Sequence, residues 1–184
     1  MVDQFEGHFI EPVPMTDTGF GKWHLHVRVK AGCRARLQRV NLYTIGFTRI
    51  SAEDFFRKLQ DNQVRSVVDV RLKADSQLSA FAKKKDLTFF LKRLLGVGYR
   101  HELLLAPSLE MLDAYKKGRK TWGSYEAEYL QLLSDRRVEQ KIRPEEIDRC
   151  CFLCSENLPH KCHRRLAAEY LVNRWGCDMA IKHL

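Results

Sequence analysis

The sequence has no long hydrophobic run, no internal repeat and no proline- or glycine-rich linker. Its apolar runs are a few residues long, far short of the about 20 residues that cross a bilayer. Residues 1–6 carry acidic side chains where a secretory signal would have a basic region. These absences predict a cytoplasmic globular protein with no membrane partner.

Cysteine is also scarce. The chain has 6 cysteines among 184 residues, well below the roughly 8–10% that is typical of disulfide scaffolds. In a reducing compartment such thiols are free, metal-bound or catalytic. Cys33 and Cys177 stand apart and read as small hydrophobic residues, whereas the other four fall between Cys150 and Cys162. This second group is therefore the one to examine for chemistry.

Acidic residues are outnumbered, since 32 Lys and Arg against 23 Asp and Glu give a net charge of +9. Such an excess favours polyanionic partners, of which nucleic acid is the commonest, although it can serve solubility alone. The best candidate for contacts to a phosphate backbone is the run Lys83, Lys84 and Lys85, with Lys73 and Arg93 in the same region. The run is equally consistent with a basic surface that contacts only solvent. We also expect that a basic protein of this kind works with a protein assembly partner.

The pattern of hydrophobic residues divides the chain into an N-terminal strand extension, 1–40, and a single α/β domain, 41–184. Residues 23–30 alternate apolar and polar side chains, as in an edge strand. His24 and His26 share the polar face there, and a solvated strand face is favoured over a metal pair.

From residue 41 onward strands alternate with helices. The predicted strands are 41–45, 64–70, 99–103, 150–154 and 179–183. The predicted helices are 51–61 with Ser51 as N-cap, one after Lys85 that Gly96 ends, 108–116, 124–134 capped by Ser124, and 162–175. This order predicts a three-layer α/β fold with a mostly parallel five-stranded sheet.

Ligands of parallel sheets bind beyond the carboxyl ends of the strands. Polar or unusual residues follow four of the predicted strands, and they are Gly46, Phe47, Thr48, Asp69, Arg71, His101, Glu102, Cys154 and Glu156. We therefore expect these loops to meet at one rim. Asp69 and Arg71 form either an ion pair within their loop or a phosphate- or carboxylate-binding fork with an orienting or basic carboxylate.

The segment 154–165 carries the most chemical information. Cys162 is predicted in the first turn of its helix, where the helix dipole favours a thiolate. His163 and Arg164 add positive charge beside it, which also favours a bound anion.

Three functional interpretations of the cysteines remain open beside simple packing, which we prefer for Cys150 and Cys151. One is a zinc site made by Cys151, Cys154, Cys162 and His163. It is disfavoured because residues three apart on a strand point to opposite faces, and because neighbouring Cys and His rarely share one metal. The second is a reversible disulfide between Cys154 and Cys162. The third is a nucleophilic thiolate with Glu156, His163 or Asp69 as its acid/base partner.

Several motifs resemble the domain of unknown function 488 family. The matching pieces are Tyr43-Thr-Ile-Gly46, Asp69-Val-Arg71, Phe81-Ala-Lys-Lys84, Tyr99-x-His-Glu102, Leu105-Ala-Pro107, Leu112-Asp-Ala-Tyr-Lys-Lys117, Trp122-x-x-Tyr125-Glu126, Cys151-Phe-Leu-Cys154-Ser-Glu156, Cys162-His-Arg-Arg165-Leu166 and Ile181-Lys-His-Leu184. The resemblance spans 41–184 and implies a three-layer α/β fold. It also implies a shared site of Cys154, Glu156, Cys162, His163, Arg164, Asp69 and Arg71. Many members have Gly-His after the first strand, whereas Phe47 follows Gly46 here, so this chain lacks that candidate base.

The sequence thus predicts an enzyme acting on a phosphate-containing or nucleic-acid substrate, without a metal cofactor. The predicted roles are a reactive Cys162 thiolate with Cys154 as partner, Glu156 and His163 as acid/base groups, and Asp69, Arg71, Arg164, Gly46 and Glu102 as the substrate- or anion-binding set. The alternative is a non-catalytic nucleic-acid or protein interaction module whose cysteine cluster is structural. A structural metal module is a third class.

Overall fold

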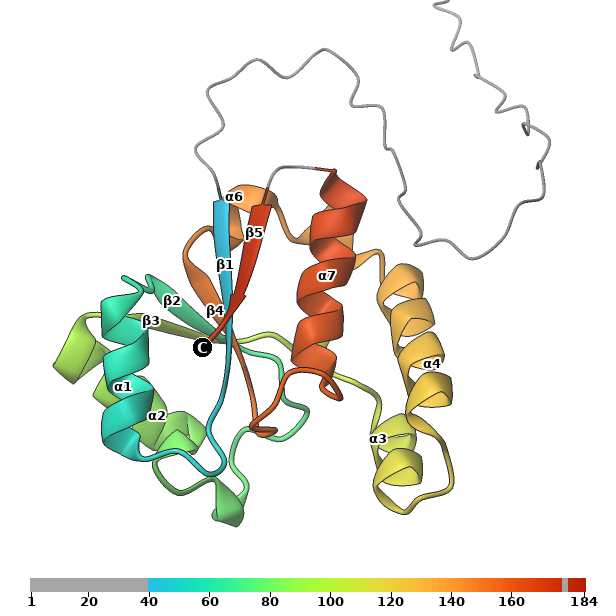
Figure 1. The fold of residues 1–184 in the computed structure, drawn as a ribbon, viewed down its shortest axis with the longest axis horizontal. Coiled ribbons are helices and arrows are strands. Elements are labelled where there is room, and N and C mark those ends of the chain that lie inside the picture. The colour runs from blue at the N-terminus through green and yellow to red at the C-terminus, as the bar shows by residue number, and fades with distance from the viewer. Residues whose placement is uncertain (1–39, 177–178) are drawn as a thin grey trace, which may run out of the picture.

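The computed structural model describes residues 40–176 and 179–184 (Figure 1). The predicted strand at 23–30, with His24 and His26, lies outside these residues, as do Cys33 and Cys177. Five parallel strands form one sheet in the order β3-β2-β4-β1-β5. The strands are β1 Val40–Gly46, β2 Ser66–Asp69, β3 Gly98–His101, β4 Cys150–Cys154 and β5 Met179–His183. The predicted α/β class and the five-stranded parallel sheet are confirmed.

Strand β4 lies in the middle of the sheet, between β1 and β2. All five of its residues are buried, as expected for a central parallel strand covered on both faces. Cys150 and Phe152 belong to the hydrophobic cluster on one face of the sheet. Cys151 and Leu153 belong to the cluster on the other face.

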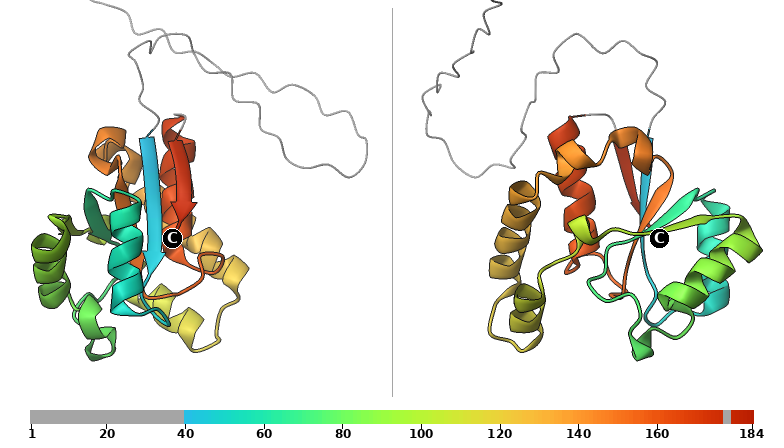
Figure 2. Two further views of the ribbon diagram at one scale, coloured as in Figure 1. Left: turned by 60° about the vertical axis from the view of Figure 1, so that its left-hand side comes forward. Right: turned by 180° about the vertical axis from the view of Figure 1, so that it is seen from behind.

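The two faces of the sheet are covered by different helices (Figures 1 and 2). Helices α1 Ala52–Asp61 and α2 Lys84–Phe90 cover one face, with the π-helical turn η2 Leu91–Leu95. Helices α3 Leu109–Lys116, α4 Trp122–Asp135 and α7 His163–Trp175 cover the other. Short helices complete the chain at η1 Gln77–Ala82, η3 Leu103–Leu105, α5 Val138–Lys141 and α6 Pro144–Ile147. Within the described ranges no helix combines the length and the apolar character needed to span a membrane.

Helix ends follow local side-chain chemistry. Ser51 caps α1 as predicted, because its hydroxyl accepts a hydrogen bond from the backbone N–H of Asp54 at 3.0 Å. Gly96 ends η2 in the left-handed conformation, with φ at 67°, as predicted. The predicted cap Ser124 is wrong: Thr121 caps α4, and its hydroxyl accepts from the N–H of Ser124 at 3.2 Å. The helix therefore begins at Trp122, two residues before the predicted start.

Candidate functional site

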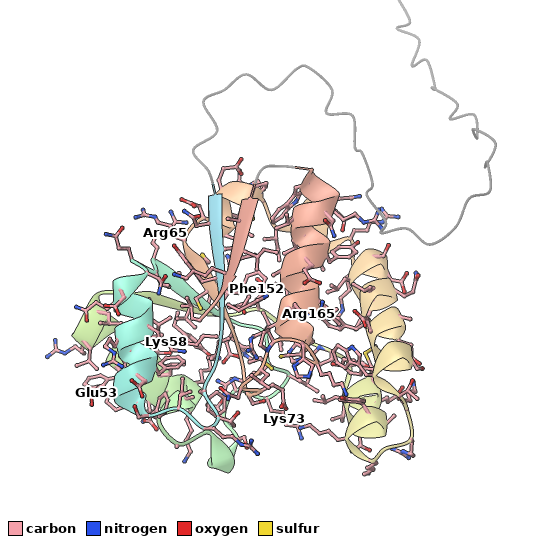
Figure 3. All side chains as sticks on the ribbon, viewed as in Figure 1. Glu53, Lys58, Arg65, Lys73, Phe152 and Arg165 are labelled. Atoms are coloured by element: carbon pink, nitrogen blue, oxygen red, sulfur yellow. The ribbon has the colours of Figure 1, made fainter. Side chains whose placement is uncertain are left out.

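A cavity of about 910 Å³ lies at the carboxyl-terminal edge of the sheet. The loops after β1, β2 and β4 line it together with α3 and α4. In Figure 3, Lys73 of the loop after β2 is labelled below Phe152 of β4, beyond the end of the strands. Three of the four loops that were predicted to meet at one rim thus line this cavity. His101 and Glu102 after β3 do not line it.

Two sulfurs and an imidazole converge at the buried side of the cavity. Cys154 is the last residue of β4, Cys162 is the N-cap of α7, and His163 is the first residue of that helix. The two Sγ atoms and a ring nitrogen of His163 all lie within 4.8 Å of one another. The Sγ of Cys154 is 3.7 Å from Nδ1 of His163. We call Cys154, Cys162 and His163 the thiol–imidazole cluster.

The cluster changes the acidity of its own members. A hydrogen bond with Cys162 holds the pKa of Cys154 well below its usual range, despite burial, and His163 adds to this effect. The same hydrogen bond, together with burial, raises the pKa of Cys162. Burial lowers the pKa of His163, but the charge of Cys154 and a hydrogen bond with it outweigh burial and raise that pKa.

Arg164 is fully buried and points away from the cavity. Its guanidinium donates to the backbone carbonyls of Glu156 and Asn157, the latter at 2.8 Å. It also donates to the Sγ of Cys162 at 3.3 Å and to the hydroxyl of Thr44 at 3.4 Å. The residue expected as an anion binder therefore fastens the loop after β4 to the sheet. Position 164 in the first turn of α7 faces inward, so its charge meets loop carbonyls instead of the cavity.

Gly46 allows that loop to cross the end of β1. A Cβ atom at position 46 would lie 1.8 Å from the carbonyl oxygen of Glu156, closer than any two such atoms approach. Gly46 is buried and outside the cavity lining, so it positions the loop and does not face a ligand. Glu156 itself is exposed and lines the cavity, where the sequence analysis had placed it.

Asp69 and Arg71 form a buried pair, and Arg71 is the member that lines the cavity. Nε of Arg71 donates to Oδ1 of Asp69 at 2.8 Å, and a second guanidinium nitrogen donates to Oδ2 at 2.5 Å. Arg71 also donates to the carbonyl of Ala82 at 2.8 Å and lies 5.1 Å from the ring centroid of Phe47. Tyr99 donates its hydroxyl to Asp69 at 2.7 Å, and burial together with this hydrogen bond raises the pKa of Tyr99. Arg71 lines the cavity with its orientation fixed, and Asp69 is the group that orients it.

Other predicted site residues lie elsewhere. The carboxylate of Glu102 accepts from the backbone N–H of Leu104 at 3.2 Å and so caps η3. Lys83, Lys84 and Lys85 lie at the start of α2 and do not line the cavity. Their contact with nucleic acid stays a prediction.

The four residues considered for zinc are not all together. Cys151 packs on the opposite face of the sheet from the cluster, as the alternation of a strand requires, and burial raises its pKa. Cys154, Cys162 and His163 do come together. Three of the four candidate ligands thus share one location.

Most of the cationic rim of this cavity was not predicted from the sequence, which indicated Lys73 only as a neighbour of the run Lys83, Lys84 and Lys85. Arg49, Lys73, Lys116 and Lys161 are exposed side chains that line it. Arg49 and Lys73 follow the first two strands, so the rule that selected Asp69 could have found them. Lys116 is on α3, and nothing in its sequence position connects it with the strand ends.

The family-model comparison matched the domain of unknown function DUF488 over residues 51–171. Comparison with curated proteins and with solved structures gave no match. The matched segment contains the cluster, the Asp69–Arg71 pair and every loop that lines the cavity except the turn of Phe47, Thr48 and Arg49. The family that the cysteine motif had suggested is confirmed, and the chain belongs to the DUF488 family.

Proposed function

We propose that this protein is an enzyme that binds a phosphate-containing substrate in the cavity and transforms it at the thiol–imidazole cluster. The observation that carries the proposal is that buried Cys154, Cys162 and His163 line a cavity of about 910 Å³. That volume is in the range of small-molecule sites, about 300–1,000 Å³. Reactive side chains at the buried side of a cavity, beyond the carboxyl ends of parallel strands, are typical of α/β enzymes.

The charge of the rim supports an anionic substrate. Arg49, Lys73, Lys116 and Lys161 are exposed around the cavity. The acidic residue Asp113, which also lines it, is bound by Lys117 at 2.8 Å and by Arg119 at 3.1 Å. Clustered cations raise the local concentration of anions and speed their association.

The cavity wall supports further roles. Arg71 presents its guanidinium in a fixed orientation, since Asp69 holds two of its nitrogens and balances its charge. Trp122 and Tyr115 give an apolar, aromatic wall from α4 and α3, in edge contact at 5.7 Å between ring centroids. Glu156 provides an exposed carboxylate for proton transfer. A nucleotide, which joins a planar base to phosphate, fits this combination of surfaces.

The proposal is tested by binding of a panel of mononucleotides and short single-stranded oligonucleotides, measured by calorimetry at several salt concentrations. The double variant Lys73→Ser/Lys161→Ser removes rim charge without touching the core. We expect it to weaken binding at least 10-fold and to reduce the salt dependence. The matched control is Lys84→Ser/Lys85→Ser, which removes the same charge outside the cavity and should bind as the wild type does.

Turnover separates the enzyme from a binding module. Cys154→Ser should abolish conversion of any bound nucleotide while leaving its affinity within about threefold. If the rim variant binds as the wild type does and the Lys84/Lys85 variant loses oligonucleotide binding, the enzyme proposal is wrong. That result would favour the non-catalytic nucleic-acid module.

A further inference from the structure

We propose that Cys154, Cys162 and His163 are the protein ligands of one zinc ion, whose fourth coordination position faces the cavity. The inference rests on the proposed function only for what the ion does, namely activate the substrate or a water. Binding of the ion is a separate claim, carried by the geometry of the three side chains.

The distances between the donor atoms match a tetrahedral ion. Zinc holds thiolate sulfur at about 2.3 Å and imidazole nitrogen at about 2.0–2.1 Å, so two such ligands lie roughly 3.5 Å apart. Sγ of Cys154 and Nδ1 of His163 are 3.7 Å apart. All three donor atoms lie within 4.8 Å of one another, so small side-chain rotations bring Cys162 into range as well.

The imidazole has the tautomer that ligation through Nδ1 needs. Nε2 of His163 lies 3.1 Å from the carbonyl oxygen of Val70, and a carbonyl can only accept, so Nε2 carries the proton. Nδ1 is then the nitrogen with a lone pair, and it lies 3.7 Å from Sγ of Cys154, the same distance as Nε2. The ring of Tyr129 packs edge-on against the imidazole, with centroids 5.7 Å apart. A backbone carbonyl that fixes the second nitrogen is the usual support of a metal-binding histidine.

The backbone explains how adjacent residues can share one ion. Cys162 precedes α7 in extended conformation, with φ −140° and ψ 134°, whereas His163 is the first helical residue. The change of conformation between them lets both side chains turn to the same point, near the end of β4 where Cys154 lies. Neighbouring residues rarely bind one metal when both lie in the same regular helix or strand. Cys162 and His163 lie on either side of the boundary between loop and helix, so this objection does not apply to them.

The surroundings accept two thiolates. The guanidinium of Arg164 donates to Sγ of Cys162 at 3.3 Å, and the positive end of the 13-residue helix α7 is adjacent. Two thiolates balance the charge of a divalent ion. Soft sulfur ligands with imidazole select zinc over magnesium or calcium. Three protein ligands with an open fourth position are the pattern of catalytic zinc, and structural sites close all four.

The test uses the full-length chain, freed of metal by a chelator under reducing conditions, and cobalt(II) as a spectroscopic probe. We expect one equivalent to give the intense visible absorption of tetrahedral cobalt with a sulfur-to-cobalt charge-transfer band, and zinc to displace it. Cys162→Ser and His163→Gln should each weaken cobalt binding at least 100-fold. The matched control Cys151→Ala, on the same sheet but the opposite face, should keep the wild-type spectrum.

A second measurement covers the case that cluster variants fold poorly. Timed alkylation of the wild type, with peptide mapping, should show at least 10-fold slower labelling of Cys154 and Cys162 when zinc is added. A cobalt spectrum without sulfur bands, or equal labelling rates with and without zinc, would overturn the zinc site. Nucleotide binding that persists in that case leaves the proposed function standing, whereas bound zinc with no nucleotide binding refutes the proposed function alone.

Discussion

Replacing Arg164 with methionine should destabilise the protein by about 2–4 kcal/mol, since the guanidinium fastens the loop after β4. Arg164 is 0% exposed and donates to the carbonyls of Glu156 and Asn157. Hydrogen bonds from a charged donor contribute about 1.5–3 kcal/mol each, so two give roughly 3–6 kcal/mol. Glu156 and Asn157 are exposed residues, and water will satisfy part of what is lost. Methionine carries no charge, so the variant avoids the cost of burying one. The expected loss of stability is therefore about 2–4 kcal/mol, below the sum of the two hydrogen bonds.

The measurement is urea denaturation followed by circular dichroism at neutral pH. The matched control is Arg165→Met, one residue further along α7, whose ion pairs with Glu169 at 2.8 Å and Glu126 at 3.4 Å lie near the surface. That change should cost no more than about 1 kcal/mol. Arg164→Lys should fall between the two, because one ammonium cannot serve both carbonyls and the sulfur of Cys162.

If Arg164→Met unfolds within about 0.5 kcal/mol of Arg165→Met, the loop does not depend on the buried guanidinium. The reasoning about positioning would then be wrong, and other contacts would hold the loop after β4.

Three further changes test other parts of the site. Gly46→Ala should cost about 3 kcal/mol or prevent folding, because its Cβ would lie 1.8 Å from a carbonyl oxygen of the loop after β4. Tyr99→Phe should cost about 1–3 kcal/mol in urea denaturation, because it removes the hydroxyl that donates to Asp69 at 2.7 Å. Burial, and then the charge of Arg164, lower the pKa of His183, so the folded protein favours the neutral ring. The stability from this residue is therefore complete above about pH 6.5 and is lost as pH falls through the lowered pKa, and His183→Gln should flatten that fall in urea midpoints.

Each of these predictions has a plain contrary result. Gly123→Ala, inside α4 where nothing lies within 4 Å of the new Cβ, should stabilise by up to about 1 kcal/mol. Equal effects at positions 46 and 123 would show that the loop does not cross β1 as described. If the Tyr99→Phe variant is as stable as the wild type, the hydrogen bond from Tyr99 to Asp69 does not contribute to stability. A pH profile of His183→Gln that is as steep as that of the wild type would assign the acid sensitivity to other groups.

The alternation of strands and helices was predictable because it depends on local hydrophobic pattern and on short-range caps. The segments 150–154 and 179–183 were predicted with the bounds that the structure has. The start of α4 was not, since the hydroxyls of Ser124 and Thr121 can both cap a helix and serine is the better cap by its own chemistry. The half-buried ring of Trp122, the first residue of α4, packs against the core and favours the earlier start.

The candidate site was predictable to the extent that it depends on strand ends. The rule for parallel sheets brought Arg71, Cys154 and Glu156 to one cavity, and the helix start brought Cys162 and His163. The direction of the Arg164 side chain could not be predicted, because its charge does not reveal whether the first turn of α7 turns it inward or outward. Cations on α3 were also beyond it, since α3 reaches the cavity only through tertiary packing.

The order of strands in the sheet has a consequence for folding. Both neighbours of β1 come from late in the chain, since Leu42 pairs with Cys150 on one side and with Ile181 on the other. Strand β2 likewise has a late partner, since Ser66–Asp69 pair with Cys150–Leu153 of β4. During synthesis β1 therefore stays unpaired until more than a hundred further residues have been made. Pairings of such long sequence separation slow folding. The sheet and the sulfur-bearing end of β4 should consequently become ordered together, in the last step of assembly.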